Sequence, residues 1–442
     1  MSNRSRSLSS TSSFISPRNR LILLGIGVFW GTATCHKMYQ DYKQEKVRKQ
    51  LIQSQVYFDP DKREVVKGDA GSGSLIHPLD PDQLAKIRSI PVSCRFAGPT
   101  VIPGGIRFTL FQYTSCPFCC KVRALLEYYG ISYDIIEVNP VLRQQLKVFP
   151  GYKKVPILVI SREEDEDGGG GHSSDSQKKE KEKDDTFFID APLQINDSSL
   201  IVSLLASYFT CNPGLQDNLN QMSEMYPAVT FASLEENKAL TEVVNKYFLM
   251  KGDHMDSEEY KRVIKGLSEE RKWREWADNV LVHTLSPNVY RTLDEAIHTF
   301  ETFSYMGDWD IHFPTWERLT VMYVGAFAMW LVGKRLKKRH GLKGDVRESL
   351  YDATKEWLTH VWKAGKGHDP RFAGGATPNL ADLAVYGIYH SIEGTDAFSE
   401  LLMHPQFSWK FKKWYTSMKE YVLLKKGSAN LVQILKHRVR PE

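Results

Sequence analysis

The chain has 442 residues, of which 42% are hydrophobic and 12% aromatic, enough to fill the cores of two or three domains. Its net charge of +5 arises at one end, because residues 1–50 carry a surplus of +7 that leaves the remaining chain at −2. Nucleic acid binding needs cationic charge gathered on a folded face, so this distribution argues against a nucleic-acid partner.

The first forty residues, 1–40, contain no acidic residue, are rich in Ser, and include most of an apolar run over 21–35. This composition is typical of an organelle transit sequence or a short membrane anchor. The run is shorter than the roughly 20 residues of a comfortable span. Two interpretations stay open: a tilted span with Arg20 and Lys37 at the interfaces, or a cleaved targeting peptide that leaves a soluble form. Both predict an organelle protein, with mitochondrion and Golgi as the candidate membranes.

Residues 41–105 are expected to be a linker, since Gly, Pro and charged residues are frequent before the first strand. From residue 106 to 212, strands and helices alternate at the spacing of a small α/β sheet. The expected elements are strands at 106–112, 133–138 and 154–160, a helix at 117–129 and a short polar helix at 140–146. A disordered, low-complexity insert over 163–185 is expected at a hairpin tip, with a strand resuming at 186.

The second half of the chain, 225–440, has a helical pattern with few strand signals. An all-α domain is therefore expected after the α/β domain. Before it, Asn196-Asp-Ser-Ser199 offers an N-cap for an apolar helix at 200–209. Within it, the basic stretch 334–340 complements the C-terminal dipole of an apolar helix. Asn379 and Asp382 have the spacing of an N-cap residue and a carboxylate three residues later.

The segment Tyr113-Thr-Ser-Cys-Pro-Phe-Cys-Cys120 lies between a predicted strand and a predicted helix. It could be a redox dithiol, half of a zinc site, a single activated thiol, or part of a core. No second C-x-x-C follows, so a zinc site would lack half its ligands and no metal is expected. A sulfur at a helix start faces unpaired N–H groups, which lowers its pKa. We therefore expect Cys116 to be the reactive thiol, Cys119 to lie within disulfide reach, and Cys120 to pack elsewhere.

The pair Val155-Pro156 stands at the third predicted strand. A trans bond is the default for this pair. A cis bond would bring the backbone of Val155 alongside Cys116 and offer an N–H and a C=O to an extended peptide ligand. The presence of the C-P-F-C motif in the same chain favours the cis alternative over this default. Both alternatives therefore stay open.

Several longer stretches of the sequence make the predicted class of protein more specific. In the first half they are LFQYTSCPFC at 110–119, EVNP at 137–140, KVPIL at 154–158 and NDSS at 196–199. In the second half they are WAD at 276–278, LVH at 281–283, SPNVYRT at 286–292, KRLKKRH at 334–340 and PNLADLAVYG at 378–387. Over roughly 106–420 the chain resembles the thioredoxin-like superfamily in its glutaredoxin and glutathione-transferase branch, and within it the membrane-associated prostaglandin E synthase type 2 family.

The resemblance implies a thioredoxin-like α/β domain followed by an all-α, glutathione-transferase-like C-terminal domain, assembled as a homodimer. It implies isomerisation of prostaglandin H2, a lipid endoperoxide, to prostaglandin E2, with Cys116 as the essential thiol and Tyr113 and Cys119 as its neighbours. The implied glutathione site consists of Phe118, Val155, Pro156, Asp197 and Ser198. The implied haem site consists of His283, Arg335 and Arg339.

Each of these residues also has a plainer interpretation. Asp197 and Ser198 suffice as a helix cap, and Tyr113 as a strand residue with its ring in the core. His283 could be an interior, hydrogen-bonded histidine, and the two arginines could be solvated at a helix end. Two other functions stay open: a glutaredoxin-like oxidoreductase in which Cys119 resolves a mixed disulfide, and a non-catalytic protein of an organelle membrane that binds haem and glutathione.

Overall fold

The computed structural model describes residues 75–102, 105–140, 142–162, 189–210, 218–233, 238–243, 245–250, 257–339 and 345–439. The predicted transit or anchor segment at 1–40 and the predicted insert at 163–185 lie outside these residues. Residues Lys67–Glu442 form one compact unit. In this unit, one hydrophobic core extends from the sheet into the C-terminal helices.

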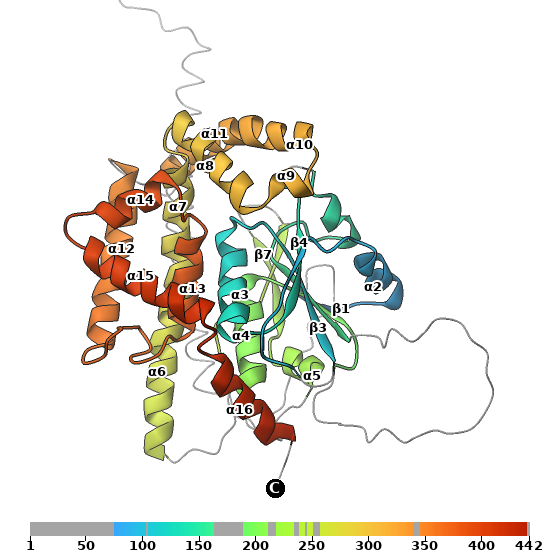
Figure 1. Ribbon diagram of the computed structural model, residues 1–442. Coiled ribbons are helices and arrows are strands. Elements are labelled where there is room, and N and C mark those ends of the chain that lie inside the picture. The colour runs from blue at the N-terminus through green and yellow to red at the C-terminus, as the bar shows by residue number, and fades with distance from the viewer. Residues whose placement is uncertain are drawn as a thin grey trace, which may run out of the picture. The chain divides into compact units, whose positions relative to one another are not determined.

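A mixed sheet of six strands organises the first half, with strand order β1-β6-β5-β3-β4-β2 (Figure 1). Strands β3 and β4 pair in parallel, and the other four neighbouring pairs are antiparallel. The bounds are β1 (Ile76–Pro78), β2 (Cys94–Phe96), β3 (Ile106–Gln112), β4 (Tyr133–Glu137), β5 (Ile157–Arg162) and β6 (Leu193–Asn196). Because β5 and β6 are neighbours, the segment at 163–185 does join two adjacent strands, with β6 beginning at Leu193. The start predicted at 186 lies outside the described residues.

Helices cover both faces of the sheet, as the unbroken burial of β5 requires. Leu158 and Ile160 of β5 belong to the larger core, on the side of α3 (Pro117–Tyr128) and α4 (Ser198–Thr210). Ile157 and Val159, which alternate with them, belong to a smaller core. That core also includes residues of α2 (Pro81–Arg88) and of the 3-10 helix η1 (Gln144–Val148). Figure 1 shows α3 and α2 on opposite sides of the strands.

The prediction of a linker over 41–105 is wrong for its second part. Residues 76–96 supply β1, α2 and β2, and both strands join the sheet at its two edges. Asp80 begins α2 as an N-cap that accepts from the Gln83 amide at 2.7 Å. The fold therefore begins about thirty residues before the predicted boundary at Ile106.

The second half is helical, as predicted, except at its start. A two-stranded hairpin of β7 (Ala228–Ser233) and β8 (Lys238–Val243) precedes the long helices, so the expectation of helix from residue 225 is wrong there. The helices are α5 (Leu219–Glu224), α6 (Ser257–Trp276), the π-helix η2 (Ala277–Leu281), α7 (Val282–Val289), α8 (Leu293–Met306), α9 (Trp309–His312), α10 (Thr315–Thr320), the π-helix η3 (Val321–Gly325), α11 (Ala326–Arg339), α12 (Val346–Ala364), α13 (Leu380–His390), α14 (Asp396–Met403), α15 (Ser408–Leu423) and α16 (Ser428–Val439).

The buried helix α13 begins with the predicted cap. The Asn379 side chain accepts from the Asp382 amide at 3.0 Å, and the Asp382 carboxylate accepts from the Asn379 amide at 3.2 Å. Asp382 also accepts from Gly374 N at 3.0 Å and from Trp414 Nε1 at 3.1 Å. Burial raises the pKa of Asp382 to about 6, although its hydrogen bonds oppose the rise. The capping box therefore fixes the start of α13 to the surrounding loop and to α15.

Helix α13 packs directly on the backbone of α3. A Cβ added at Gly387 would lie 2.7 Å from both the carbonyl carbon and oxygen of Cys120 and from the amide nitrogen of Lys121. Since backbone atoms cannot rotate away, this position admits no side chain. The close approach sets α3, and the thiol at its start, against the C-terminal helices.

We expect Gly387→Ala to lower the free energy of unfolding by about 1–3 kcal/mol, although alanine favours helix, because the methyl group overpacks the α3 backbone. Urea denaturation measures the change. Gly266→Ala in α6 is the matched control, because nothing lies within 4 Å of its added Cβ. That control should gain up to about 1 kcal/mol from helix propensity. Equal changes in the two variants would contradict the packing described for Gly387.

Candidate functional site

Cys116 is the N-cap residue of α3, as its position in the sequence predicted. Its amide donates to the Tyr113 carbonyl at 3.0 Å, and its carbonyl accepts from the Cys120 amide at 2.9 Å. The side chain of Cys116 is partly exposed, whereas Cys119 and Cys120 are buried. All three are free thiols. The reachable sulfur is therefore the one at the positive end of the helix.

The two sulfurs of the C-P-F-C motif differ in acidity. A side-chain hydrogen bond from Cys119 lowers the pKa of Cys116; burial opposes this, while the amides of Cys119 and Phe118 add to it. Burial raises the pKa of Cys119 well above its usual value, and the neighbouring Cys116 raises it further. The arrangement is a thiolate at Cys116 that accepts from the thiol of Cys119. A single activated thiol is thus available without a disulfide.

Three tyrosines lie within electrostatic reach of this thiolate. Burial first, and then the charge of Cys116, raise the pKa of Tyr113, while the charge and hydrogen bond of Arg143 lower it in part. Burial and the charge of Asp197 raise the pKa of Tyr152 to about 12, and the two cysteines contribute to that rise as well. All the phenols are therefore protonated near neutral pH and can act as donors.

The third tyrosine, Tyr290, comes from the C-terminal end of α7. Burial raises its pKa, and Cys116 is the charged group that adds to the rise. Sequence reasoning missed both Tyr152 and Tyr290. Tyr290 stood in the string at 286–292, but nothing in its own neighbourhood in the sequence connects it with a thiol in the first half.

A buried polar network holds the loop before Cys116, and sequence reasoning missed it too. Glu137, at the end of β4, accepts from the Thr114 amide at 2.7 Å and from the Thr114 hydroxyl at 2.9 Å. Arg123 of α3 donates to the Thr114 carbonyl at 3.0 Å and to Cys120 Sγ at 3.1 Å. Burial raises the pKa of Glu137 against these hydrogen bonds, and raises that of Cys120 to about 11. Cys120 is therefore a packing residue, as expected. The two carboxylates of β4, Asp134 and Glu137, in a strand whose other residues are apolar or aromatic were the available signal.

The Val155–Pro156 peptide bond is cis, which is the second of the two alternatives for this pair. Val155 is partly buried against the smaller core, and so are Tyr113 and Tyr152. The backbone of Val155, which is predicted to bind a peptide, therefore borders the same hydrophobic core as Tyr113 and Tyr152.

Asp197 has the plainer role expected of it, as the residue before α4. Its Oδ1 accepts from the Ser199 amide at 2.8 Å and from the Leu200 amide at 3.2 Å. Its Oδ2 forms an ion pair with Lys246 at 3.1 Å. Ser198, the first residue of α4, is 4% exposed. Asp197 retains partial exposure, so a ligand can still reach its Oδ2.

A second buried polar cluster joins α3 to the C-terminal helices. Lys121 of α3 pairs with Asp278 of η2 and donates to Ser199 Oγ at 3.0 Å. Asp278 also accepts from Tyr247 at 3.0 Å. Burial acts to raise the pKa of Asp278, but Lys121 and the hydrogen bonds prevail and hold it below its usual range. The cluster therefore fixes the helix that carries Cys116 and Phe118 to α4 and η2.

The predicted haem residues lie on two helices, α7 and α11. His283 is exposed on α7, and Arg335 is exposed on α11, where Arg339 is the last residue. A Cβ added at Gly333 would lie 3.4 Å from the Tyr290 carbonyl of α7. Arg335 follows Gly333 by two residues, which turns it about 200° around the helix and away from α7. Both His283 and Arg335 are exposed, and a haem site that includes them stays a prediction. The described residues contain no group of three or more His, Cys, Asp or Glu placed to hold a metal ion.

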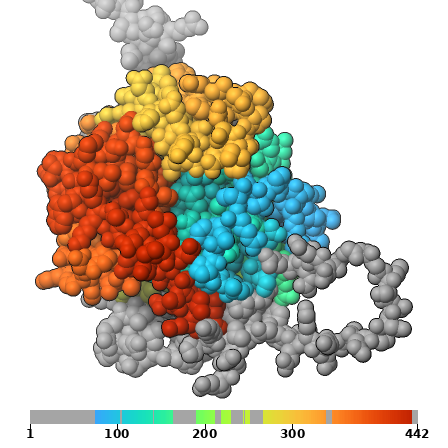
Figure 2. All heavy atoms as spheres, in the orientation of Figure 1, coloured from blue at the N-terminus to red at the C-terminus, as the bar shows by residue number. Residues whose placement is uncertain are grey.

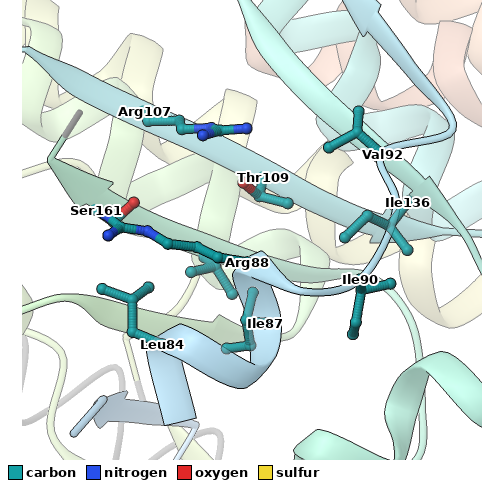
Figure 3. A pocket seen from close by; sticks show the side chains of 10 residues that line it. Leu84, Ile87, Arg88, Ile90, Val92, Arg107, Thr109, Ile136 and Ser161 are labelled. Atoms are coloured by element: carbon teal, nitrogen blue, oxygen red, sulfur yellow. The ribbon is translucent and has the colours of Figure 1, made fainter. Parts of the chain in front are cut away.

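Figure 3 shows a hollow on the other side of the sheet, between α2 and strands β3 and β5. Leu84 and Ile87 of α2 lie on one side of it and Thr109 of β3 on the other, and Val159 of β5 also lines it. Its volume is about 20 Å³, space for little more than one water molecule. It lies on the α2 side and its lining does not include Cys116, so it is not part of the thiol site.

Comparison with known proteins gives the following similarities. The glutaredoxin family model matches residues 108–164. Prostaglandin E synthase 2 of Mus musculus is 39% identical over 331 residues, covering 74% of this chain and 73% of the relative. Prostaglandin E synthase 2 of Danio rerio is 36% identical over 315 residues, covering 71% of each chain.

Among solved structures, a delta-class glutathione transferase of Nilaparvata lugens aligns with 75% of this chain and 99% of its own, at 13% identity and a TM-score of 0.31. The predicted fold class, a thioredoxin-like α/β part followed by a mostly helical part, is confirmed by the glutaredoxin match and the elements described above. The extent and identity of the two curated matches confirm the predicted family: this chain belongs to the prostaglandin E synthase 2 family.

Proposed function

We propose that this chain is an isomerase that converts prostaglandin H2 to prostaglandin E2, with Cys116 as the essential thiol. The observation that carries the proposal is the asymmetry of the C-P-F-C motif. Cys116 has a lowered pKa and partial exposure, while Cys119 is buried and protonated. The names of the relatives supply the substrate class. A single exposed thiolate suits a reaction that needs one nucleophile and no net reduction.

The proposed reaction begins at the weak O–O bond of the endoperoxide. The Cys116 thiolate attacks one oxygen and forms an S–O bond, while the O–O electron pair leaves on the other oxygen as an alkoxide. A base then removes the proton from the ring carbon that bears the sulfur-bound oxygen. The C–H pair becomes the C=O bond, and the S–O pair returns to sulfur. The products are a ketone, a hydroxyl and the original thiolate, with no electron gained or lost.

In this proposal, Tyr113 first donates a proton and then takes one back. Its hydroxyl donates to the departing alkoxide, and the phenolate so formed takes the proton from the ring carbon. The raised pKa of Tyr113 supports the second role, because it makes the phenolate a strong base. One residue thus acts first as acid and then as base, and the enzyme returns to its starting state.

We propose glutathione as the bound cofactor, which a glutaredoxin-type fold implies. The backbone of Val155, beside the cis Pro156, would pair with the peptide, and Phe118 would border it. Asp197 Oδ2 would accept from the glutathione amine, and Ser198 and the N-terminus of α4 would receive its carboxylate. The ion pair of Lys246 with Asp197 opposes the first contact, so the amine would share that carboxylate with Lys246.

A glutaredoxin-like oxidoreductase is the second candidate, favoured by one observation. Cys119 donates its hydrogen to Cys116, so the two sulfurs are close enough to form a disulfide after attack on a mixed disulfide. The burial and raised pKa of Cys119 count against rapid resolution. Haem binding, a homodimer and a mitochondrial or Golgi membrane, reached through the N-terminal segment, stay predictions from the family resemblance.

Incubation of the purified full chain with prostaglandin H2, with and without haem, tests the proposal beside a standard disulfide-reduction assay. Cys116→Ser serves as the blank for spontaneous decay of the endoperoxide. We expect prostaglandin E2 well above the blank without added haem, and slow disulfide reduction. Efficient disulfide reduction without prostaglandin E2 would favour the oxidoreductase. Saturable haem binding with neither activity would favour the non-catalytic binding protein.

A further inference from the structure

The continuous helical stretch formed by α10, η3 and α11 has an exposed apolar face. By length and composition, its segment Thr315–Lys337 could cross a membrane. Only 17% of the apolar part of this segment is buried in the protein. In Figure 2 the yellow and orange atoms of α8 to α11 form one continuous surface at the top of the view.

One side of this stretch is fixed to the protein. Val321, Ala326 and Gly333 are buried. A Cβ added at Gly325 would lie 2.9 Å from the ring of Phe300 in α8, and Gly333 faces the carbonyl of Tyr290 as described above. Because this side packs on α7 and α8, the stretch could cross a bilayer only by separating from them or by carrying them into the lipid.

The other side carries a row of large apolar side chains. Trp316 is 63% exposed, Tyr323 53%, Phe327 49% and Leu331 48%. Their spacings of seven, four and four residues place them along one face of a helix. Aromatic and aliphatic side chains that share one face of an otherwise packed helix are typical of segments that lie in a membrane interface.

Charge distinguishes the C-terminal end of the row. Five cationic residues follow Leu331, namely Lys334, Arg335, Lys337, Lys338 and Arg339. Lys334 lies over the ring of Trp330, with its Nζ 3.7 Å from the ring centroid. The sole carboxylate between residues 315 and 339 is Glu317, and it accepts a hydrogen bond from Asn139 at 2.6 Å. The exposed row therefore has apolar and cationic groups and no acidic group of its own.

We propose that this face, with Trp316, Tyr323, Phe327 and Leu331 inserted and the exposed cations Lys334 and Arg335 at the headgroups, docks on an anionic phospholipid bilayer. The docking is in the plane of the membrane and is separate from any anchor at residues 1–40. Anionic headgroups complement the cationic end, and apolar side chains displace interfacial water. The surface holds the thiol site beside the phase in which a lipid endoperoxide dissolves.

A second copy of the chain fits this face less well. In an isologous contact the same residues meet on both copies, so the cations of one copy would need carboxylates within the same row of the other. The row offers Glu317 alone, and that residue is already bonded to Asn139. Burial against a second copy would leave the exposed cations Lys334 and Arg335 without carboxylates across the contact.

Hydrogen exchange of the full chain tests the proposal locally, whatever the N-terminal segment does. Vesicles of phosphatidylcholine with phosphatidylserine should slow exchange in peptides covering 315–333, and vesicles of phosphatidylcholine alone should do so far less. Lys334→Gln with Arg335→Gln should raise the lipid concentration needed for half protection by about thirtyfold, since each cation near such a surface contributes roughly a factor of five.

Tyr323→Asp with Phe327→Asp should remove the protection, with circular dichroism used to verify folding. Met403→Asp with Leu424→Asp is the matched control, because these apolar side chains are at least as exposed but lie on α14 and at the end of α15. The control should keep the protection. Exchange unchanged by anionic vesicles would overturn the proposal. Protection that grows with protein concentration in the absence of vesicles would overturn it in favour of a second copy.

Discussion

Cys116→Ser is expected to abolish formation of prostaglandin E2, with a loss on the order of 10³-fold or more in kcat/KM. The reason is that Cys116 is the partly exposed thiol at the start of α3, and it alone among the three neighbouring cysteines has a lowered pKa. Serine keeps the size of the side chain but is not ionised near neutral pH. Product analysis after a fixed time, against an uncatalysed sample, measures the loss.

The matched comparison is at Cys119. Cys119→Ser should keep much of the activity, because its hydroxyl still donates to Cys116, whereas Cys119→Ala removes the donor and should raise the pKa of Cys116. The wild-type rate should rise with pH and level off below the usual thiol pKa of 9.0. In Cys119→Ala that rise should move to higher pH, since the thiolate then forms less readily. Equal loss in Cys116→Ser and Cys119→Ser would indicate a dithiol mechanism.

Lys121→Met is expected to lower the free energy of unfolding by about 3–5 kcal/mol, because it leaves the Asp278 carboxylate buried without its cation. Lys121 is 2% exposed and Asp278 12%. The pKa of Asp278 is lowered in the folded chain, so its contribution is present above the usual carboxyl range and is lost as pH falls through the lowered pKa. Without Lys121 the pKa of Asp278 should rise.

Chemical denaturation at neutral pH measures this loss, and Lys419→Met supplies the control. Lys419 pairs with Glu393 at 2.6 Å, but its side chain is 39% exposed, so its removal should cost no more than about 1 kcal/mol. A loss in Lys121→Met as small as in the control would contradict the buried ion pair as the connection between α3 and η2.

Sequence patterns predicted the central elements because their side chains are buried in a regular way. Strand β3 was predicted with its observed bounds, and α3 and α4 within two residues, since long apolar runs between turn signals are distinctive. Strands β1 and β2 have three residues each, lie at the sheet edges and are only partly buried. Such short strands have no alternation to detect, and they depend on pairing with β6 and β4.

The site was predictable only where its residues are close in the sequence. The spacing of Cys116 and Cys119 at a helix start indicated which thiol is activated, because helix geometry alone decides it. Tyr152 and Tyr290 come from a loop and from a helix of the second half, so their approach to Cys116 depends on tertiary packing. The haem site stays a prediction, since the four-residue spacing of Arg335 and Arg339 describes a helix face and does not say which groups that face contacts.

The redox balance of a single turnover reaction tests the central claim most directly. Prostaglandin H2 is incubated with the purified full chain and glutathione, and prostaglandin E2 and oxidised glutathione are measured in the same sample. Isomerisation at Cys116 consumes no electrons, so prostaglandin E2 should account for the endoperoxide consumed, with no oxidised glutathione above the background. Formation of one oxidised glutathione per endoperoxide consumed, with a diol in place of the ketone, would show that the chain reduces the endoperoxide and would contradict the account.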